Sequence, residues 1–212
     1  QWQCYKLGFA IFGVALLTLM NMRGVKESVI PLVPIFLVFV VTHASVIVYA
    51  LMLHSSGFPA VIHSTVSELH KTRAEMGLFG TIFLLLRAYS MGAGTYTGIE
   101  AVSNGLPILR EPKVKTGKRT MRYMSVSLAF TVMGLMLAYL LFKVESQPGK
   151  TLNAVLFQYI TVNWGRPGYL FVLITLISEA MLLFVAAQAG FLDGPRVLSN
   201  MALDRWCPTR FS

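Results

Sequence analysis

The chain has 212 residues, of which 55% are hydrophobic and 13% are charged. A soluble domain usually carries about 25% charged residues, so this composition excludes an ordinary soluble protein and indicates a membrane protein. The formal net charge of +9 would also suit a nucleic-acid partner. The basic residues fall in loops between apolar segments, however, so no nucleic-acid binding is expected.

Five apolar segments are close to the length of about 20 residues that a membrane helix needs. In chain order they are residues 7–22, 32–53, 77–102, 123–142 and 169–192. We therefore predict an all-α membrane protein in which residues 1–212 form a single transmembrane domain that crosses the lipid bilayer five times.

The distribution of Lys and Arg predicts the orientation of the chain. The loops at residues 23–31, 103–122 and 193–212 carry eleven basic residues, whereas the loops at residues 54–76 and 143–168 carry five. Basic loops stay on the cytoplasmic side of a membrane. We therefore expect the first set to be cytoplasmic and the protein to lie in the inner (plasma) membrane.

Two segments on the opposite side are predicted to be helices that are too polar to span and that lie over the bundle. Residues 61–69 carry a partial apolar stripe, and residues 152–160 carry a fuller one after a predicted Thr151 cap. The second helix could be an outer lid or a plain cover. Near the C-terminus, Pro195 is expected to break the fifth span and to start a short helix.

The third span is interrupted by Gly92, Gly94 and Gly98, followed by the carboxylate of Glu100. Glycine destabilises a helix by roughly 1 kcal/mol relative to alanine. In hydrocarbon, each freed backbone polar group costs several kcal/mol unless a polar partner receives it. A break near residues 94–98 therefore predicts a ligand site or a water-filled cavity, as in transporters whose half-helices meet at an unwound point.

Several motifs, taken in order and with their spacing, resemble the amino acid-polyamine-cation (APC) superfamily. They are Gly94-Thr-Tyr-Thr-Gly-Ile-Glu-Ala-Val-Ser-Asn104, Glu111-Pro112, Gly117-Lys-Arg-Thr-Met121, Asn21-Met-Arg-Gly-Val-Lys-Glu-Ser28 and Asp193-Gly-Pro-Arg-Val-Leu-Ser-Asn-Met-Ala-Leu-Asp204. Within the superfamily, the string from Tyr96 to Asn104 resembles most closely the KimA-type bacterial potassium importers, which couple potassium entry to protons.

The resemblance implies a LeuT-type fold of two inverted five-helix repeats with a discontinuous sixth helix. The chain would then be an internal fragment that covers helices four to eight. Helices one to three and nine onward of the same protein would be missing, and in this family helices one and three complete the binding site. A homodimer is left open.

The resemblance also implies that Thr97 and Glu100 belong to the cation site and hold a potassium ion. The i, i+3 spacing puts both side chains on one face of a half-helix that starts near Thr97. Hydroxyl and carbonyl oxygens beside one carboxylate suit a dehydrated monovalent cation. Tyr96 could gate the site or donate to it, and the carbonyls of Gly94 and Gly98 are candidate ligands.

Alternatives stay open for the two central residues. Glu100 could carry the coupled proton, because a poorly hydrated cavity favours the neutral acid, or it could be a structural cap. The hydroxyl of Thr97 could bond back to its own helix backbone.

Three further ionisable residues are predicted at membrane depth, namely His43, Arg87 and Glu179. Such residues usually face the bundle interior or a cavity. Glu179 is a candidate for a proton or cation path, and its alternative role is a helix contact. Arg87 is expected to pair with Glu179 or to line an outer vestibule, and His43 to be a satisfied interior histidine in preference to a proton sensor.

An enzyme is not expected, because the spacing of Gly92, Gly94 and Gly98 is not that of a dinucleotide-binding loop. No Ser-His-Asp or metal-ligand cluster is evident, and no cofactor is predicted besides the transported potassium ion and proton. The main alternative is a proton-coupled amino acid permease of the same superfamily. Glu100 does not separate the two readings, whereas the Tyr96-Thr97 pair favours potassium. A sensor or scaffold would have no need for a carboxylate at membrane depth.

Overall fold

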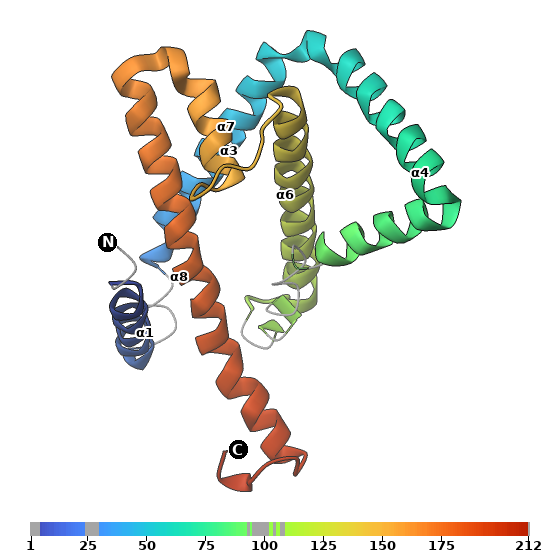
Figure 1. The fold of residues 1–212 in the computed structure, drawn as a ribbon. Coiled ribbons are helices and arrows are strands. Elements are labelled where there is room, and N and C mark those ends of the chain that lie inside the picture. The colour runs from blue at the N-terminus through green and yellow to red at the C-terminus, as the bar shows by residue number, and fades with distance from the viewer. Residues whose placement is uncertain are drawn as a thin grey trace. The chain divides into compact units, whose positions relative to one another are not determined.

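The structure, a computed structural model, describes residues 5–23, 30–92, 94, 102–103, 105–106 and 109–211. Every regular element in these residues is a helix. The main ones are α1 (Lys6–Arg23), α3 (Leu32–Leu53), α4 (Phe58–Gly92), α6 (Lys113–Leu141), α7 (Leu152–Thr161) and α8 (Gly165–Leu203) (Figure 1).

Three stretches of the described chain are helical, long enough and apolar enough to cross a membrane. They are α3, α6 and the stretch Leu152–Leu203, and Lys6–Met22 is a shorter apolar helix. Large apolar side chains remain exposed along them, such as Phe36 on α3 and Met133 on α6, because lipid tails are as apolar as these side chains. The prediction of an all-α, multi-pass membrane protein is confirmed, while the number of crossings stays a prediction.

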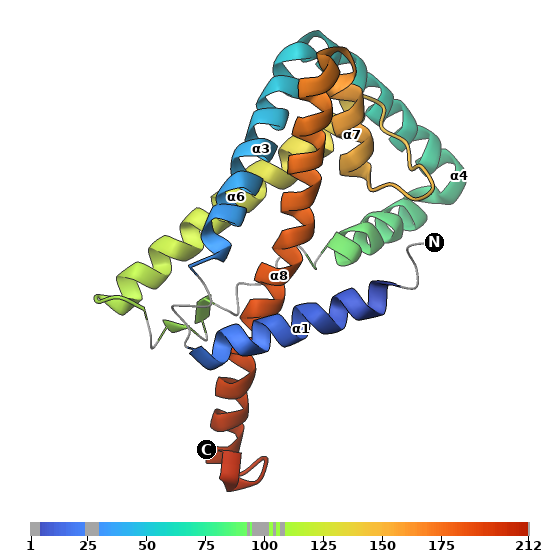
Figure 2. The same cartoon turned by 90° about the vertical axis from the view of Figure 1, so that its left-hand side faces the viewer.

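Helix α4 consists of two arms that meet at Gly77, and both views show the bend in the teal-to-green helix (Figure 1, Figure 2). Gly77 has φ 71° and ψ 176°, a backbone conformation that essentially only glycine adopts. The Thr81 hydroxyl donates to the Gly77 carbonyl at 2.8 Å, at the start of the second arm. The third predicted span therefore begins at a structural corner.

Three sequence-based expectations about helices need correction. The helix predicted at residues 61–69 exists in the first arm of α4, but its apolar side chains at Ile62, Val66 and Leu69 are exposed instead of lying over the described bundle. Helix α6 begins at Lys113, so part of the loop assigned to residues 103–122 is helical. Lys and Arg are good helix formers, and the Glu111 carboxylate accepts a hydrogen bond from the Lys113 backbone N–H at 3.2 Å.

The third correction concerns Pro195, which does not break the last span. Helix α8 continues from Gly165 to Leu203 with Pro195 inside it (Figure 2). A proline removes one backbone hydrogen bond and is costly in a water-exposed helix. Membrane helices tolerate it more readily where neighbouring groups receive the freed carbonyl.

The chain divides into two units, one of residues 1–42, 100–120 and 173–212 and the other of residues 43–99 and 121–172. In the second unit, helix α7 supplies more of the buried hydrophobic residues than any other helix. Its side chains from Ala154 to Phe157 are buried, as is Ile160. The Thr151 hydroxyl accepts a hydrogen bond from the Ala154 backbone N–H at 3.2 Å, so the predicted cap is confirmed.

Helices α3 and α6 approach each other closely within the second unit. Gly134 lies against Ile47, and a Cβ atom at residue 134 would overlap the Ile47 side chain. Ala50 and Ala138 are fully buried. Small residues at four-residue spacing let membrane helices come together in this way, which explains why α6 has Gly134 and Ala138 four residues apart.

Candidate functional site

The glycine-rich segment begins where the second arm of α4 ends, at Gly92. At 1.5 Å per residue, the arm from Leu78 to Gly92 is about 22 Å long, shorter than the roughly 30 Å hydrocarbon core. A Cβ atom at Gly92 or Gly94 would meet open space. Close packing therefore does not require glycine at these two positions, and the predicted break near residues 94–98 stays a prediction.

The centre of the predicted cation site lies outside the described residues. Tyr96, Thr97, Gly98 and Glu100 fall there, and their assignment as ligands stays a prediction. Gly94 is described and exposed. The structure therefore locates the end of the helix that leads to the site.

Helix α8 carries a second group of polar residues at membrane depth, within the candidate span Leu152–Leu203. Thr175 is fully buried and Ser178 is 4% exposed, while Glu179 is half-buried. The i, i+3 and i, i+4 spacings put all three on one side of the helix. The Ser178 hydroxyl donates to the Thr175 carbonyl at 2.7 Å. Glu179 is thus the one ionisable member of this polar group on the described part of α8 between Thr175 and Gln188.

The other two ionisable residues predicted at membrane depth occupy different settings. Arg87 lies exposed on the second arm of α4. It belongs to the second unit and Glu179 to the first, so their suggested pairing stays a prediction. His43 on α3 is 1% exposed, with its ring 5.4 Å from that of Phe157 in an edge-to-face contact. His43 is therefore an interior packing residue, as expected.

In the first unit, a buried pair of amides joins α1 to α8. The Asn21 amide N–H donates to Gln188 Oε1 at 2.8 Å, and the Gln188 amide N–H donates to Asn21 Oδ1 at 2.8 Å. Gln188 is 3% exposed. Together the two bonds pair both side-chain amides. Burying either amide among apolar side chains without a hydrogen-bond partner would cost free energy.

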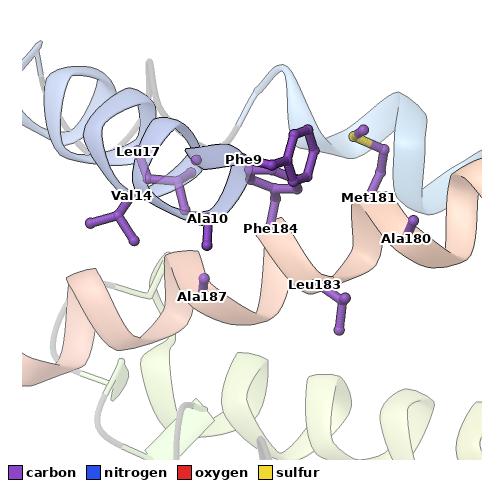
Figure 3. Close-up of a pocket in the computed structure, with 10 residues that line it drawn as sticks. Phe9, Ala10, Val14, Leu17, Ala180, Met181, Leu183, Phe184 and Ala187 are labelled. Carbon is purple, nitrogen blue, oxygen red and sulfur yellow. The ribbon is translucent and has the colours of Figure 1, made fainter. Parts of the chain in front are cut away.

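Next to this pair, the same two helices border an apolar groove of about 350 Å³ (Figure 3). The ring of Phe9 meets that of Phe184 edge to face, with 6.0 Å between centroids. Phe184 also lies over Gly13, where a Cβ atom would come within 2.7 Å of the ring. Gly13 thus provides the space in which the aromatic ring packs.

Replacing Asn21 by leucine should destabilise the protein by about 1–3 kcal/mol, because the buried Gln188 amide loses its partner. The double variant Asn21→Leu/Gln188→Leu should recover most of this loss, since no buried amide is then left unsatisfied. Thermal unfolding of the purified protein in detergent measures both. Equal losses in the single and double variants would contradict a direct pair.

The amide pair and the Thr175–Ser178 group were missed by reasoning from sequence. Asn21 and Gln188 are 167 residues apart, and nothing local connects them. A signal was available for the second group, because Thr175, Ser178 and Glu179 interrupt an otherwise apolar run at helical spacing. In the part of the chain that the structure describes, no three His, Cys, Asp or Glu residues are placed to hold a metal ion.

Comparison with known proteins gives one informative match. The chain is 30% identical over 212 residues to the potassium transporter KimA of Bacillus subtilis (strain 168). The alignment covers 98% of this chain and 33% of that protein. That relative is a transporter and not an enzyme, in agreement with the sequence-based prediction. No family model matches the chain, and no solved structure matches it.

The chain thus spans about a third of the length of this relative. The shared segment contains the glycine-rich motif, the polar face of α8 and both partners of the amide pair, since it leaves out only a few residues of this chain. The resemblance of this chain to the KimA-type potassium transporters is therefore confirmed over nearly its whole length.

Proposed function

We propose that the complete protein imports potassium across the inner membrane, coupled to protons, by alternating access. The observation that carries this proposal is the 30% identity to a potassium transporter over 98% of the chain. In this proposal the chain contributes helices four to eight, and the remaining helices complete the site.

The proposed cation site lies where the second arm of α4 gives way to the glycine-rich segment. The hydroxyl of Thr97 and the carboxylate of Glu100 hold a dehydrated potassium ion together with the carbonyls of Gly94 and Gly98, and Tyr96 borders the site. Oxygens of modest field strength replace the hydration shell of the ion, and the carboxylate offsets its charge. Glu179 on α8 then carries the coupled proton, with the buried Thr175 hydroxyl beside it.

The complete protein should restore growth of a potassium-uptake-deficient bacterium at low external potassium. Liposomes that contain the purified protein should accumulate potassium or rubidium faster when an inward proton gradient is imposed. Failure of both, together with accumulation of a labelled amino acid, would contradict potassium import and favour an amino acid permease.

Replacing Glu179 by glutamine should remove the response to the proton gradient while potassium exchange continues. We expect gradient-driven uptake to fall roughly tenfold, which corresponds to about 1.4 kcal/mol. Glu145→Gln is the matched control, because it removes the same charge from an exposed residue between α6 and α7. A Glu179→Gln protein that keeps its gradient response but unfolds at lower temperature would show that Glu179 is a structural helix contact.

A further inference from the structure

The first arm of α4, residues 58–76, has one apolar and one polar face. Apolar side chains recur at Phe58, Ile62, Val66 and Leu69, a spacing that places them on one side of a helix. The opposite side carries Ser64, Ser67, Glu68, Lys71 and Glu75. The arm is thus amphipathic, although it is too polar to cross a membrane.

Phe58 at the start of the arm is half-buried, but nothing in the described part of the chain covers the apolar face from Ile62 to Leu69. Ile62 is 63% exposed, and Val66 and Leu69 are each 48% exposed. From Ile62 to Lys71, every side chain is exposed. A row of large apolar groups that is exposed in this way marks a surface for a membrane or a protein.

The second arm of α4 indicates that the exposed apolar face of the first arm contacts a membrane and not another protein. It begins immediately after the corner at Gly77 and exposes large apolar side chains, among them Phe79 at 87% and Phe83 at 71%. This apolar arm is the start of the predicted third span, residues 77–102, so it belongs inside a bilayer. The first arm therefore leads directly into a segment that enters the membrane, which places the first arm at the membrane surface.

We propose that residues 58–76 form a membrane-surface helix, whose apolar face lies among the lipid headgroups and upper acyl chains. Gly77 is the corner at which the chain turns from the surface into the bilayer. This role does not depend on which solute the protein transports.

The charges of the arm fit the headgroup region better than a protein interior. Glu68, Glu75, Lys71 and Arg73 give the arm no formal net charge. Arg73 falls on the apolar face itself, one helical turn after Leu69, where its long side chain can reach the headgroups while its stem stays in the apolar layer. A helix with such faces lies in the plane of the interface.

Site-directed fluorescence in liposomes tests this proposal on the complete protein. A polarity-sensitive fluorophore is attached to single cysteines at residues 62 and 69 of the apolar face, and at residues 64 and 71 as matched controls on the polar face. All other cysteines are replaced by serine. Because these four positions are exposed, the labels should not disturb packing. Lipids with brominated acyl chains and aqueous iodide serve as the two quenchers.

Brominated lipid should quench the labels at residues 62 and 69 several-fold more strongly than those at residues 64 and 71, and iodide should show the reverse order. Equal iodide quenching on both faces would overturn the proposal, because the arm would then lie in water. Protection of residues 62 and 69 from both quenchers would also overturn it, since a protein surface or a second copy would then cover them.

A change at the corner provides a second, independent measurement. Gly77→Ala introduces a side chain at φ 71°, so the turn should be lost and quenching at residue 62 by brominated lipid should fall to the level of residue 64. Gly8→Ala is the matched control, because Gly8 lies inside α1 and a Cβ atom there meets open space. Unchanged quenching in the Gly77→Ala protein would contradict the role of Gly77.

Discussion

Glu100→Gln should abolish potassium uptake by the complete protein, whereas Glu145→Gln should leave it unchanged. Glutamine has nearly the same shape as glutamate but no charge. At an effective dielectric constant near 20, a carboxylate about 4 Å from a monovalent cation contributes about 4 kcal/mol. Since 1.4 kcal/mol is a factor of about ten in affinity, we expect uptake to fall roughly 100-fold or more.

Three further variants separate a cation ligand from a structural carboxylate. Glu100→Asp should retain measurable uptake, because the charge remains within reach of the ion. Thr97→Ser should retain more uptake than Thr97→Ala, because only the first keeps a hydroxyl ligand. Uptake of rubidium into liposomes, normalised to the amount of reconstituted protein, measures all of them. Uptake by the Glu100→Gln protein within twofold of the unaltered protein would remove Glu100 from the site.

Helix signals read from adjacent residues in the sequence predicted those parts of the fold that depend only on such residues. The bounds of α3 follow from a largely apolar run between Leu32 and Leu53, in which Thr42, His43 and Ser45 are the polar residues. The N-terminus of α7 follows from the Thr151 cap, whose bond reaches only to Ala154. The corner at Gly77 coincides with the first residue of the predicted third span, because a polar segment changes into an apolar one there.

The same sequence signals failed where the structure depends on residues far apart in the sequence or on the wider context of a helix. Proline usually ends a helix, yet α8 continues through Pro195 to Leu203. The amide pair of Asn21 and Gln188 could not be predicted, since it depends on how α1 and α8 pack. For the candidate site, the break was predicted near residues 94–98, mostly outside the described residues, whereas the described helix α4 extends to Gly92.

Together, the two ends of the second arm of α4 relate the fold to the proposed mechanism. In the proposed arrangement, Gly77 marks the entry of the chain into the bilayer, and the described helical arm from Leu78 to Gly92 is about 22 Å long, shorter than the hydrocarbon core. We propose that the chain beyond this arm then lies within the hydrocarbon layer, where free carbonyls need a polar partner. A cation and the nearby carboxylate of Glu100 would meet that need.

Gly134→Leu should strongly destabilise the protein, because α3 and α6 have no room for a side chain at that position. Overpacking of a filled core typically costs 1–3 kcal/mol and sometimes more. The melting temperature of the purified protein in detergent measures the effect. Gly8→Ala is again the control, and we expect it to be neutral or stabilising by up to about 1 kcal/mol.

A double-variant cycle shows whether the loss arises at this particular contact. Gly134→Ala places its new methyl group against Ile47, and Ile47→Ala alone removes a fully buried side chain at a cost of about 2–5 kcal/mol. In the combined variant the new methyl group occupies part of the space that Ile47 leaves, so the combined loss should be smaller than the sum of the single losses. Additive losses would mean that α3 and α6 do not pack at this point, and the burial of Ala50 and Ala138 would then need another cause.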